Sequence, residues 1–186
     1  LTRQVIPAVL RDEDRTRPYL PSSPYISEAV YKAGVEFIPE DHIWGPRLYY
    51  KGEYYRHTHC HFASEIGYHG SPSVASLRKF ISADKLWPYG NEEWRLHITD
   101  PVPGLDQFGY LVDLVRRQHV EIFGKFPDTL EEFVWADQVK QAEAFKFFIE
   151  RFRAQKWRRT GILWWNLWDG CPELSNALVD YYGEKK

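Results

Sequence analysis

The feature that most constrains the fold is a near-continuous apolar run of strand length close to the C-terminal end. It spans residues 161–167 and reads Gly-Ile-Leu-Trp-Trp-Asn-Leu. A run of this kind is typical of a strand in a sheet that is covered on both faces, because a solvated face would require alternating polar residues. We therefore expect helices to pack against this strand.

Extended segments and helices alternate along the chain, which predicts an α/β fold with parallel strands. Candidate strands end near Ser22, Trp44, Glu65 and Leu167. The first lies in residues 17–24, where three prolines favour an extended segment. A complete (β/α)8 barrel needs about 250 residues. We therefore expect residues 1–186 to form one structural piece, equivalent to half of such a barrel.

The helices are predicted from periodicity and from their end signals. Short helices are expected near 4–10 and 27–33, and Gly34 ends the second. A further helix begins at Ser71-Pro72, with Ser71 as its cap. Two longer helices follow: one carries apolar residues from Leu105 and Phe108 to Ile122 and stops at Gly124, and the other covers 130–152 with Asp128 and Glu131 as its cap pair.

Composition narrows the function classes. With 24 Lys and Arg against 26 Asp and Glu, the net charge of −2 provides no basic surface for a nucleic acid, and no apolar run reaches the length of a membrane span. Two cysteines cannot form a disulfide framework. The 8 Trp, 12 Tyr and 11 Phe residues suit either an aromatic core or a cleft for a flat, hydroxyl-covered ligand such as a sugar ring.

Glu65 is the strongest candidate for chemistry, because it interrupts the apolar segment 62–67. A charge in such a segment costs free energy unless it is paired or useful. At the C-terminal end of a barrel strand, a carboxylate can act as nucleophile, general base or metal ligand. The alternative is a buried ion pair with an arginine such as Arg17 or Arg47.

His57, His59 and His61 form a second candidate. On a strand the three rings would share one face, and two of them could bind zinc together with a distant third ligand. The alternative is a set of ordinary histidines, hydrogen-bonded around the rim of a barrel. We favour the alternative and expect neither a metal nor an organic cofactor.

Three tryptophans near the last strand form a third candidate. By side-chain period, Trp164, Asn166 and Trp168 point in one direction, and Trp165 and Leu167 in the other. One set is expected to line the barrel interior and the other to meet the outer helices. An indole stacked beneath a sugar ring is the functional interpretation, and core packing is the alternative.

Four motifs in order resemble the C-terminal half of the catalytic barrel of glycoside hydrolase family 2, most closely its β-mannosidase-like branch. The motifs are residues 17–24, Asp41-His42-Ile43-Trp44, residues 62–73 around Ser64-Glu65-Ile66-Gly67, and residues 161–186. The resemblance implies a portion of a (β/α)8 TIM barrel, about strands 5 to 8 with their helices. The upstream half and accessory β-sandwich domains would then belong to a parent chain.

The same resemblance implies residue roles. Glu65 takes the position of the nucleophile in a retaining mechanism. The acid/base Glu of the family lies upstream of everything present here, and Asn91-Glu92 follows the nucleophile, so its order is wrong. The residues expected to bind the sugar are Ser23, His42, Trp44, Trp165, Asn166 and Trp168.

The implied activity is that of a retaining exo-β-glycosidase acting on terminal β-linked sugars, most plausibly β-mannosides. Two alternatives stay open, namely a non-catalytic sugar-binding module and another specificity of the family, such as β-galactosidase or exo-β-glucosaminidase. A zinc hydrolase built on His57, His59 and His61 ranks last. The implied partners are a carbohydrate and the remainder of the parent chain, in a secreted, periplasmic or lysosomal-type compartment. Expressed alone, residues 1–186 are expected to be aggregated or inactive.

Overall fold

Three short parallel strands form the sheet of the computed structural model, which describes residues 1–98 and 110–186. The strands are β1 (Glu40–His42), β2 (Phe62–Ile66) and β3 (Gly161–Trp164), in the order β1-β2-β3. Parallel strands need crossover connections, and here the connections carry helices. The predicted mixed α/β class with parallel strands is confirmed.

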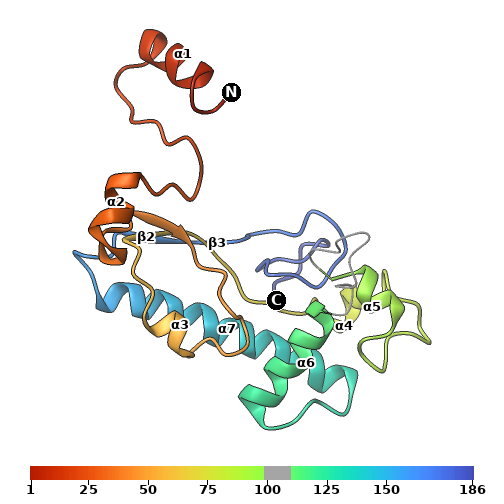
Figure 1. Cartoon of the computed structure of the whole chain (residues 1–186). Coiled ribbons are helices and arrows are strands. Elements are labelled where there is room, and N and C mark those ends of the chain that lie inside the picture. Colours follow the sequence, from red (N-terminus) through yellow and green to blue (C-terminus); the bar gives the residue numbers. More distant parts are fainter. Residues whose placement is uncertain (99–109) are drawn as a thin grey trace.

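The described helices differ in length. They are α1 (Val5–Glu13), α2 (Glu28–Ala33), the 3₁₀ turn η1 (Val35–Phe37), α3 (Glu53–Arg56), α4 (Val74–Leu77), α5 (Glu92–Leu96), α6 (Tyr110–Phe123) and α7 (Leu130–Ala154). Helices α3 and α7 lie on one side of the sheet, and α1 stands away from the rest with no buried residue (Figure 1). No helix among residues 1–98 and 110–186 has the length and apolar character that a membrane crossing requires.

The predicted C-terminal ends of two helices are confirmed, whereas the predicted N-terminal cap of α4 is not. Gly34 caps α2 with a positive φ of 123°, and Gly124 follows α6 with a φ of 80°, as predicted. The cap of α4 is Ser73, whose hydroxyl accepts from the backbone N–H of Ser76, so the prediction of Ser71 was wrong. Several small hydroxyl residues stand together there, and the local pattern does not separate them.

The cap of α7 was also misplaced. Thr129 caps it by accepting from the backbone N–H of Glu132, and Glu132 reaches back to the N–H of Asp128. The capping pair is therefore Thr129 and Glu132, one residue beyond the predicted Asp128 and Glu131. Leu105 and Phe108 of the preceding predicted helix lie outside the described residues.

Two strand predictions also differ from the structure. Residues 17–24 form bends and irregular backbone, so the strand predicted to end near Ser22 is absent. Strand β3 ends at Trp164, three residues before Leu167, and only one of its faces is covered in the described part of the chain. Leu163 on the other face is 54% exposed.

Helix α7 joins two parts of the hydrophobic core. Its first half packs with α4, α5 and α6 around Trp94 and Phe133. Its second half carries Phe148 against Ala63 and Ile66 of β2. On β3, the Trp164 ring meets Phe145 of α7 edge to face, with 4.7 Å between ring centroids. One helix therefore fixes the sheet relative to the smaller helices.

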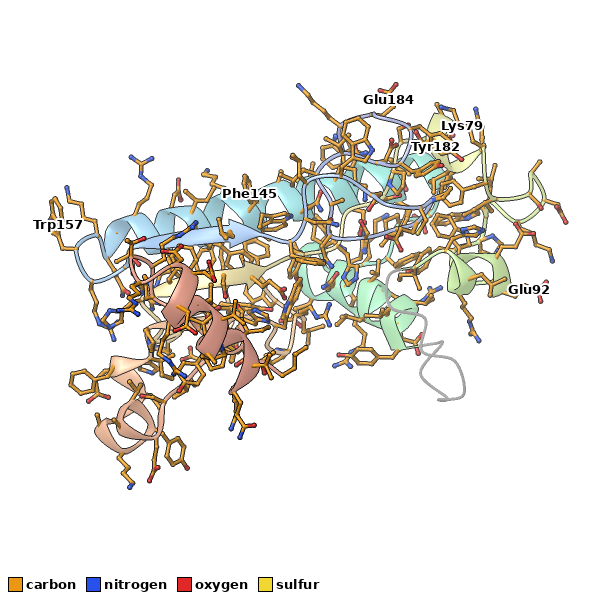
Figure 2. The ribbon with its side chains drawn as sticks, turned by 90° about the horizontal axis from the view of Figure 1, so that it is seen from above. Lys79, Glu92, Phe145, Trp157, Tyr182 and Glu184 are labelled. Carbon is orange, nitrogen blue, oxygen red and sulfur yellow. The ribbon has the colours of Figure 1, made fainter. Side chains whose placement is uncertain are left out.

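The C-terminal segment folds back over the shorter helices. Lys186 is buried and forms an ion pair with Asp169 at 2.7 Å, and it also donates to Ser175. The Lys79 amine lies 4.3 Å from the centre of the Tyr182 ring, and Figure 2 shows these two side chains next to each other. These contacts hold the segment that follows β3 in place.

A fully buried histidine gives the core a pH dependence. Neither ring nitrogen of His69 has a hydrogen-bond partner among the described residues. Burial, together with the charges of Arg47, Lys140 and Lys186, holds the pKa of His69 well below its usual value. Below about pH 6.5, the unfolded chain therefore takes up a proton that the folded chain excludes.

We predict that the free energy of unfolding falls as the pH is lowered from about 7 to about 5, by up to about 1.4 kcal/mol per pH unit for this ring. Replacing His69 by Leu should flatten that slope, whereas replacing the exposed His57 by Leu should leave it unchanged. Urea unfolding at several pH values measures both. An unaltered slope in the His69→Leu variant would assign the effect to other groups.

Candidate active site

Glu65 lies near the C-terminal end of β2 with its side chain 25% exposed, and two donors meet one of its oxygens. The indole Nε1 of Trp44 donates to Oε2 at 2.7 Å, and Nδ1 of His42 lies 3.2 Å from the same atom. Among the described residues, Oε1 has no hydrogen-bond partner. One carboxylate oxygen is therefore held while the other is left for a ligand.

A bulge in β2 brings neighbouring side chains to the same side of the sheet. Asp41 pairs with Ala63 and His42 pairs with Glu65, so Ser64 has no counterpart in β1. In a regular strand, Ser64 and Glu65 would point to opposite faces. With the extra residue, Ser64 contacts Glu40 while Glu65 contacts His42.

Glu40 is a buried carboxylate next to this cluster, only 9% exposed. It accepts hydrogen bonds from the hydroxyls of Ser23 and Ser64 and from the backbone N–H of Tyr25, the last at 3.1 Å. Burial alone would raise the pKa of Glu40, but these donors outweigh it and hold the pKa below its ordinary value. Glu40 is therefore an ionised, fully engaged carboxylate.

The loop that carries Trp44 is fixed from the helical side. The Arg47 guanidinium lies 5.1 Å from the centre of the Trp44 ring, and the Arg47 carbonyl accepts from the Gln118 amide at 2.6 Å. Gln118 in turn accepts from the buried Lys140 amine at 2.8 Å, and Lys140 is paired with Asp137. A chain of buried polar contacts thus connects α7 and α6 to the indole that holds Glu65.

Four of the predicted site residues lie together, namely Ser23, His42, Trp44 and Glu65. The hydroxyl of Ser23 is 3.2 Å from Nε2 of His42. Arginine pairing of Glu65 was the alternative, but among the described residues Arg17 pairs with Asp14, and Arg47 stacks on Trp44. The partners of Glu65 are an indole and an imidazole.

The predicted tryptophans separate into different environments. Trp165 follows β3 and is 50% exposed; its backbone N–H donates to the Ile66 carbonyl at 2.8 Å. Trp164 points the other way and packs on α7. Asn166 is half-buried, and Trp168 lies beside Gly183 and pairs with Val179. Through its backbone, Trp165 contacts the strand that carries Glu65, while the described contacts of Trp168 are with the C-terminal segment.

The three histidines do not lie on a strand. His57 follows α3 and pairs with Glu53, and His61 lies next to the Glu36 carbonyl; all three histidines precede β2. The prediction of one shared strand face was therefore wrong. In residues 1–98 and 110–186, no three or more His, Cys, Asp or Glu side chains gather in a way that could hold a metal ion.

Glu40 and Ser64 were missed as parts of the site. A signal for Glu40 existed, because Glu40, His42 and Trp44 alternate along one extended segment and so share one face. No comparable signal existed for Ser64, since its direction depends on the bulge. Chemically, the cluster can present a carboxyl group with one oxygen that has no partner among the described residues, the arrangement required of a carboxylate nucleophile or general base.

With this geometry described, the chain can be compared with known proteins. No family model matches it. It is 26% identical to the β-mannosidase of Bos taurus over 97% of this chain, and 29% identical to the exo-β-D-glucosaminidase of Arthroderma benhamiae over 79%. A crystal structure of the β-D-mannosidase from Dictyoglomus thermophilum matches the whole chain at 27% identity with a TM-score of 0.75. The chain spans 22%, 16% and 22% of these proteins' lengths, respectively.

The chain is therefore related to glycoside hydrolases. More narrowly, its resemblance to the β-mannosidase-like branch of glycoside hydrolase family 2, predicted from the four motifs, is confirmed over 97% of the chain by the Bos taurus sequence and over the whole chain by the Dictyoglomus thermophilum structure.

Gly67 offers a test of this geometry. A Cβ at this position would lie 2.6 Å from the Trp165 carbonyl and 2.6 Å from the Trp44 ring. The clash with the carbonyl can be relieved only by moving backbone, and the clash with the ring requires the indole of Trp44 to move.

We predict that Gly67→Ala destabilises the protein by about 1 to 3 kcal/mol. Gly170→Ala is the matched control, because no atom of the described residues beyond its two chain neighbours lies within 4 Å of the Cβ it would add, and it should change stability by less than about 0.5 kcal/mol. Thermal unfolding of both variants measures the difference. Equal melting temperatures would show that Trp44 is not packed against Gly67.

Proposed function

We propose that this chain contributes the nucleophile half of the active site of a retaining exo-β-glycosidase that acts on terminal β-mannosides. The observation that carries the proposal is Glu65, whose Oε2 is held by Trp44 and His42 while no described residue binds Oε1. The β-mannosidases among the relatives support the choice of sugar. The exo-β-D-glucosaminidase relative supports a second candidate specificity, that of an exo-β-glucosaminidase.

In the proposed mechanism, Glu65 Oε1 attacks the anomeric carbon and forms a C–O bond as the glycosidic C–O bond breaks. The leaving oxygen takes a proton from a carboxylic acid in the part of the protein outside this chain. Water, deprotonated by the same group, then cleaves the glycosyl-enzyme and releases the sugar with retained configuration. The indole of Trp44 and the ring of His42 stabilise the ionised carboxylate before attack and after its release.

We place residues 1–186 as part of a catalytic barrel, about strands 5 to 8 with their helices. Strand β3 is an edge strand, and beside it lies an apolar groove of about 330 Å³ lined by Phe145, Phe148, Ile149, Ile162, Leu163 and Trp164. An open strand edge next to an apolar groove suits pairing with a further strand and its helix. The upstream half of the barrel and accessory β-sandwich domains would supply them.

The exposed ring of Trp165 is proposed to form part of the floor beneath the sugar, because an indole face suits the apolar face of a pyranose. Asn166 and Trp168, with His42 and Trp44, complete the proposed sugar-contacting set. For Ser23, the described contacts favour a role in holding His42 over direct contact with the sugar.

The decisive experiment compares the full-length parent protein with its Glu65→Gln variant on aryl β-mannoside, β-galactoside, β-glucosaminide and β-glucuronide substrates. The wild type should prefer the mannoside, with the β-anomer of the sugar formed first by NMR. The variant should lose at least about 10³-fold in kcat, and it should retain sugar binding by calorimetry. Incubation with a 2-deoxy-2-fluoro mannosyl fluoride should add one fluorosugar to the peptide that contains Glu65.

The matched control is Glu53→Gln, the same change at an exposed carboxylate on α3, which should leave kcat unchanged. Near wild-type turnover by Glu65→Gln, or fluorosugar on another peptide, would refute the assignment of the nucleophile. Sugar binding without turnover by the wild type would favour the sugar-binding module instead.

A further inference from the structure

Four polar side chains form a line from the buried Glu40 to Glu65. The hydroxyl of Ser23 donates to Oε1 of Glu40 and lies 3.2 Å from Nε2 of His42. On the other side of the same ring, Nδ1 lies 3.2 Å from Oε2 of Glu65. His42 is therefore placed between two carboxylates, one reached directly and one through a hydroxyl.

The number of available protons decides which of these groups donate hydrogen bonds and which accept them. A serine hydroxyl has one proton to donate, and Ser23 gives it to Glu40, because an ionised carboxylate can only accept. Towards His42, Ser23 can then offer only a lone pair. The 3.2 Å contact is a hydrogen bond only if Nε2 of His42 carries a proton and donates it.

The contact on the opposite side of the ring requires a second proton. Oε2 of an ionised Glu65 can only accept, so Nδ1 must also carry a proton to make the contact attractive. With Nε2 already protonated, the ring is an imidazolium. A neutral ring with Nε2–H would turn the lone pair of Nδ1 towards the carboxylate.

We infer that Glu40 is a positioning residue for the nucleophile, which acts through Ser23 to hold His42 as an imidazolium that donates to Glu65 Oε2. The inference rests on the proposed glycosidase function. The inference gives the site a second carboxylate, Glu40, which positions other side chains and does not attack the sugar. The cation occupies Oε2 and leaves Oε1 as the attacking oxygen.

The surroundings of His42 agree with a cation. The charged groups that face it are Glu40 and Asp41 on its own strand and Glu65 on β2, and all three are acids. From the segment before α2, the ring meets the uncharged Ser23. The positive charge of Arg47 lies over the indole of Trp44.

Replacing Glu40 by Gln should reverse the line of hydrogen bonds. The backbone N–H of Tyr25 donates to the Oε2 position, so the amide oxygen of Gln must occupy that position. The amide N–H2 then takes the Oε1 position and donates to the hydroxyls of Ser23 and Ser64, which both approach it. Ser23 becomes free to donate to Nε2, and a neutral His42 with Nδ1–H satisfies Glu65.

The test measures kcat/KM of the full-length protein on dinitrophenyl β-mannoside between about pH 5 and pH 9. This leaving group needs no proton, so the acid/base group outside this chain does not shape the profile. Glu40→Gln should lower kcat/KM about tenfold at acidic pH, where the wild type holds the imidazolium. The ratio of wild type to variant should shrink towards alkaline pH, because the proposed difference of one proton between the two proteins disappears there.

Ser23→Ala removes the link while keeping both carboxylates, so it should show the same pH-dependent ratio, and it decides the question if Glu40→Gln fails to fold. Glu40→Asp keeps the charge and should restore part of the loss at acidic pH. Glu53→Gln, at a carboxylate paired with the exposed His57, should give a ratio of about one at every pH.

The outcomes separate the two proposals. An active wild type with a ratio that is the same at every pH would show that Glu40 only supports the fold, and it would overturn the inference while leaving the glycosidase proposal intact. A wild type that turns over none of the aryl β-glycosides would remove the proposed function and, with it, this inference.

Discussion

One extra residue in β2 decides which side chains meet at the candidate active site. Because Ser64 has no counterpart in β1, Ser64 reaches Glu40 while Glu65 reaches His42. A regular strand would send one of them to the helix-covered face, where it would compete with the packing of Ala63 and Ile66. The hydrogen bonds of both carboxylates therefore depend on an irregularity of the backbone.

The two carboxylates beside this bulge have complementary surroundings. Glu40 is buried and accepts from three donors, so it stays ionised with no oxygen left for a ligand. Glu65 is partly exposed, and both of its donors converge on a single oxygen. Because their environments differ, two groups of the same chemistry have different roles. Glu40 is suited to holding neighbouring side chains in place, and Glu65 is suited to reacting with a substrate.

Local signals allowed much of this to be predicted from sequence. The alternation of strands and helices, the end of α2 at Gly34 and the unusual position of Glu65 all follow from short-range patterns. The caps of α4 and α7 were misplaced by one or two residues, because several residues there can act as caps. The contact between Ser23 and Glu40 joins residues 17 positions apart through an irregular segment, and no periodicity encodes it.

The support of Trp44 shows why the site also needs the helical side of the fold. The indole that donates to Glu65 stacks with Arg47, whose carbonyl is held by Gln118 of α6, and Gln118 is held by Lys140 of α7. Each of these buried polar groups would cost free energy without its partner. The cluster is therefore favourable only when α6 and α7 are packed together. Since α7 also fixes the sheet, the same packing that forms the core sets the direction of the hydrogen bond to the proposed nucleophile.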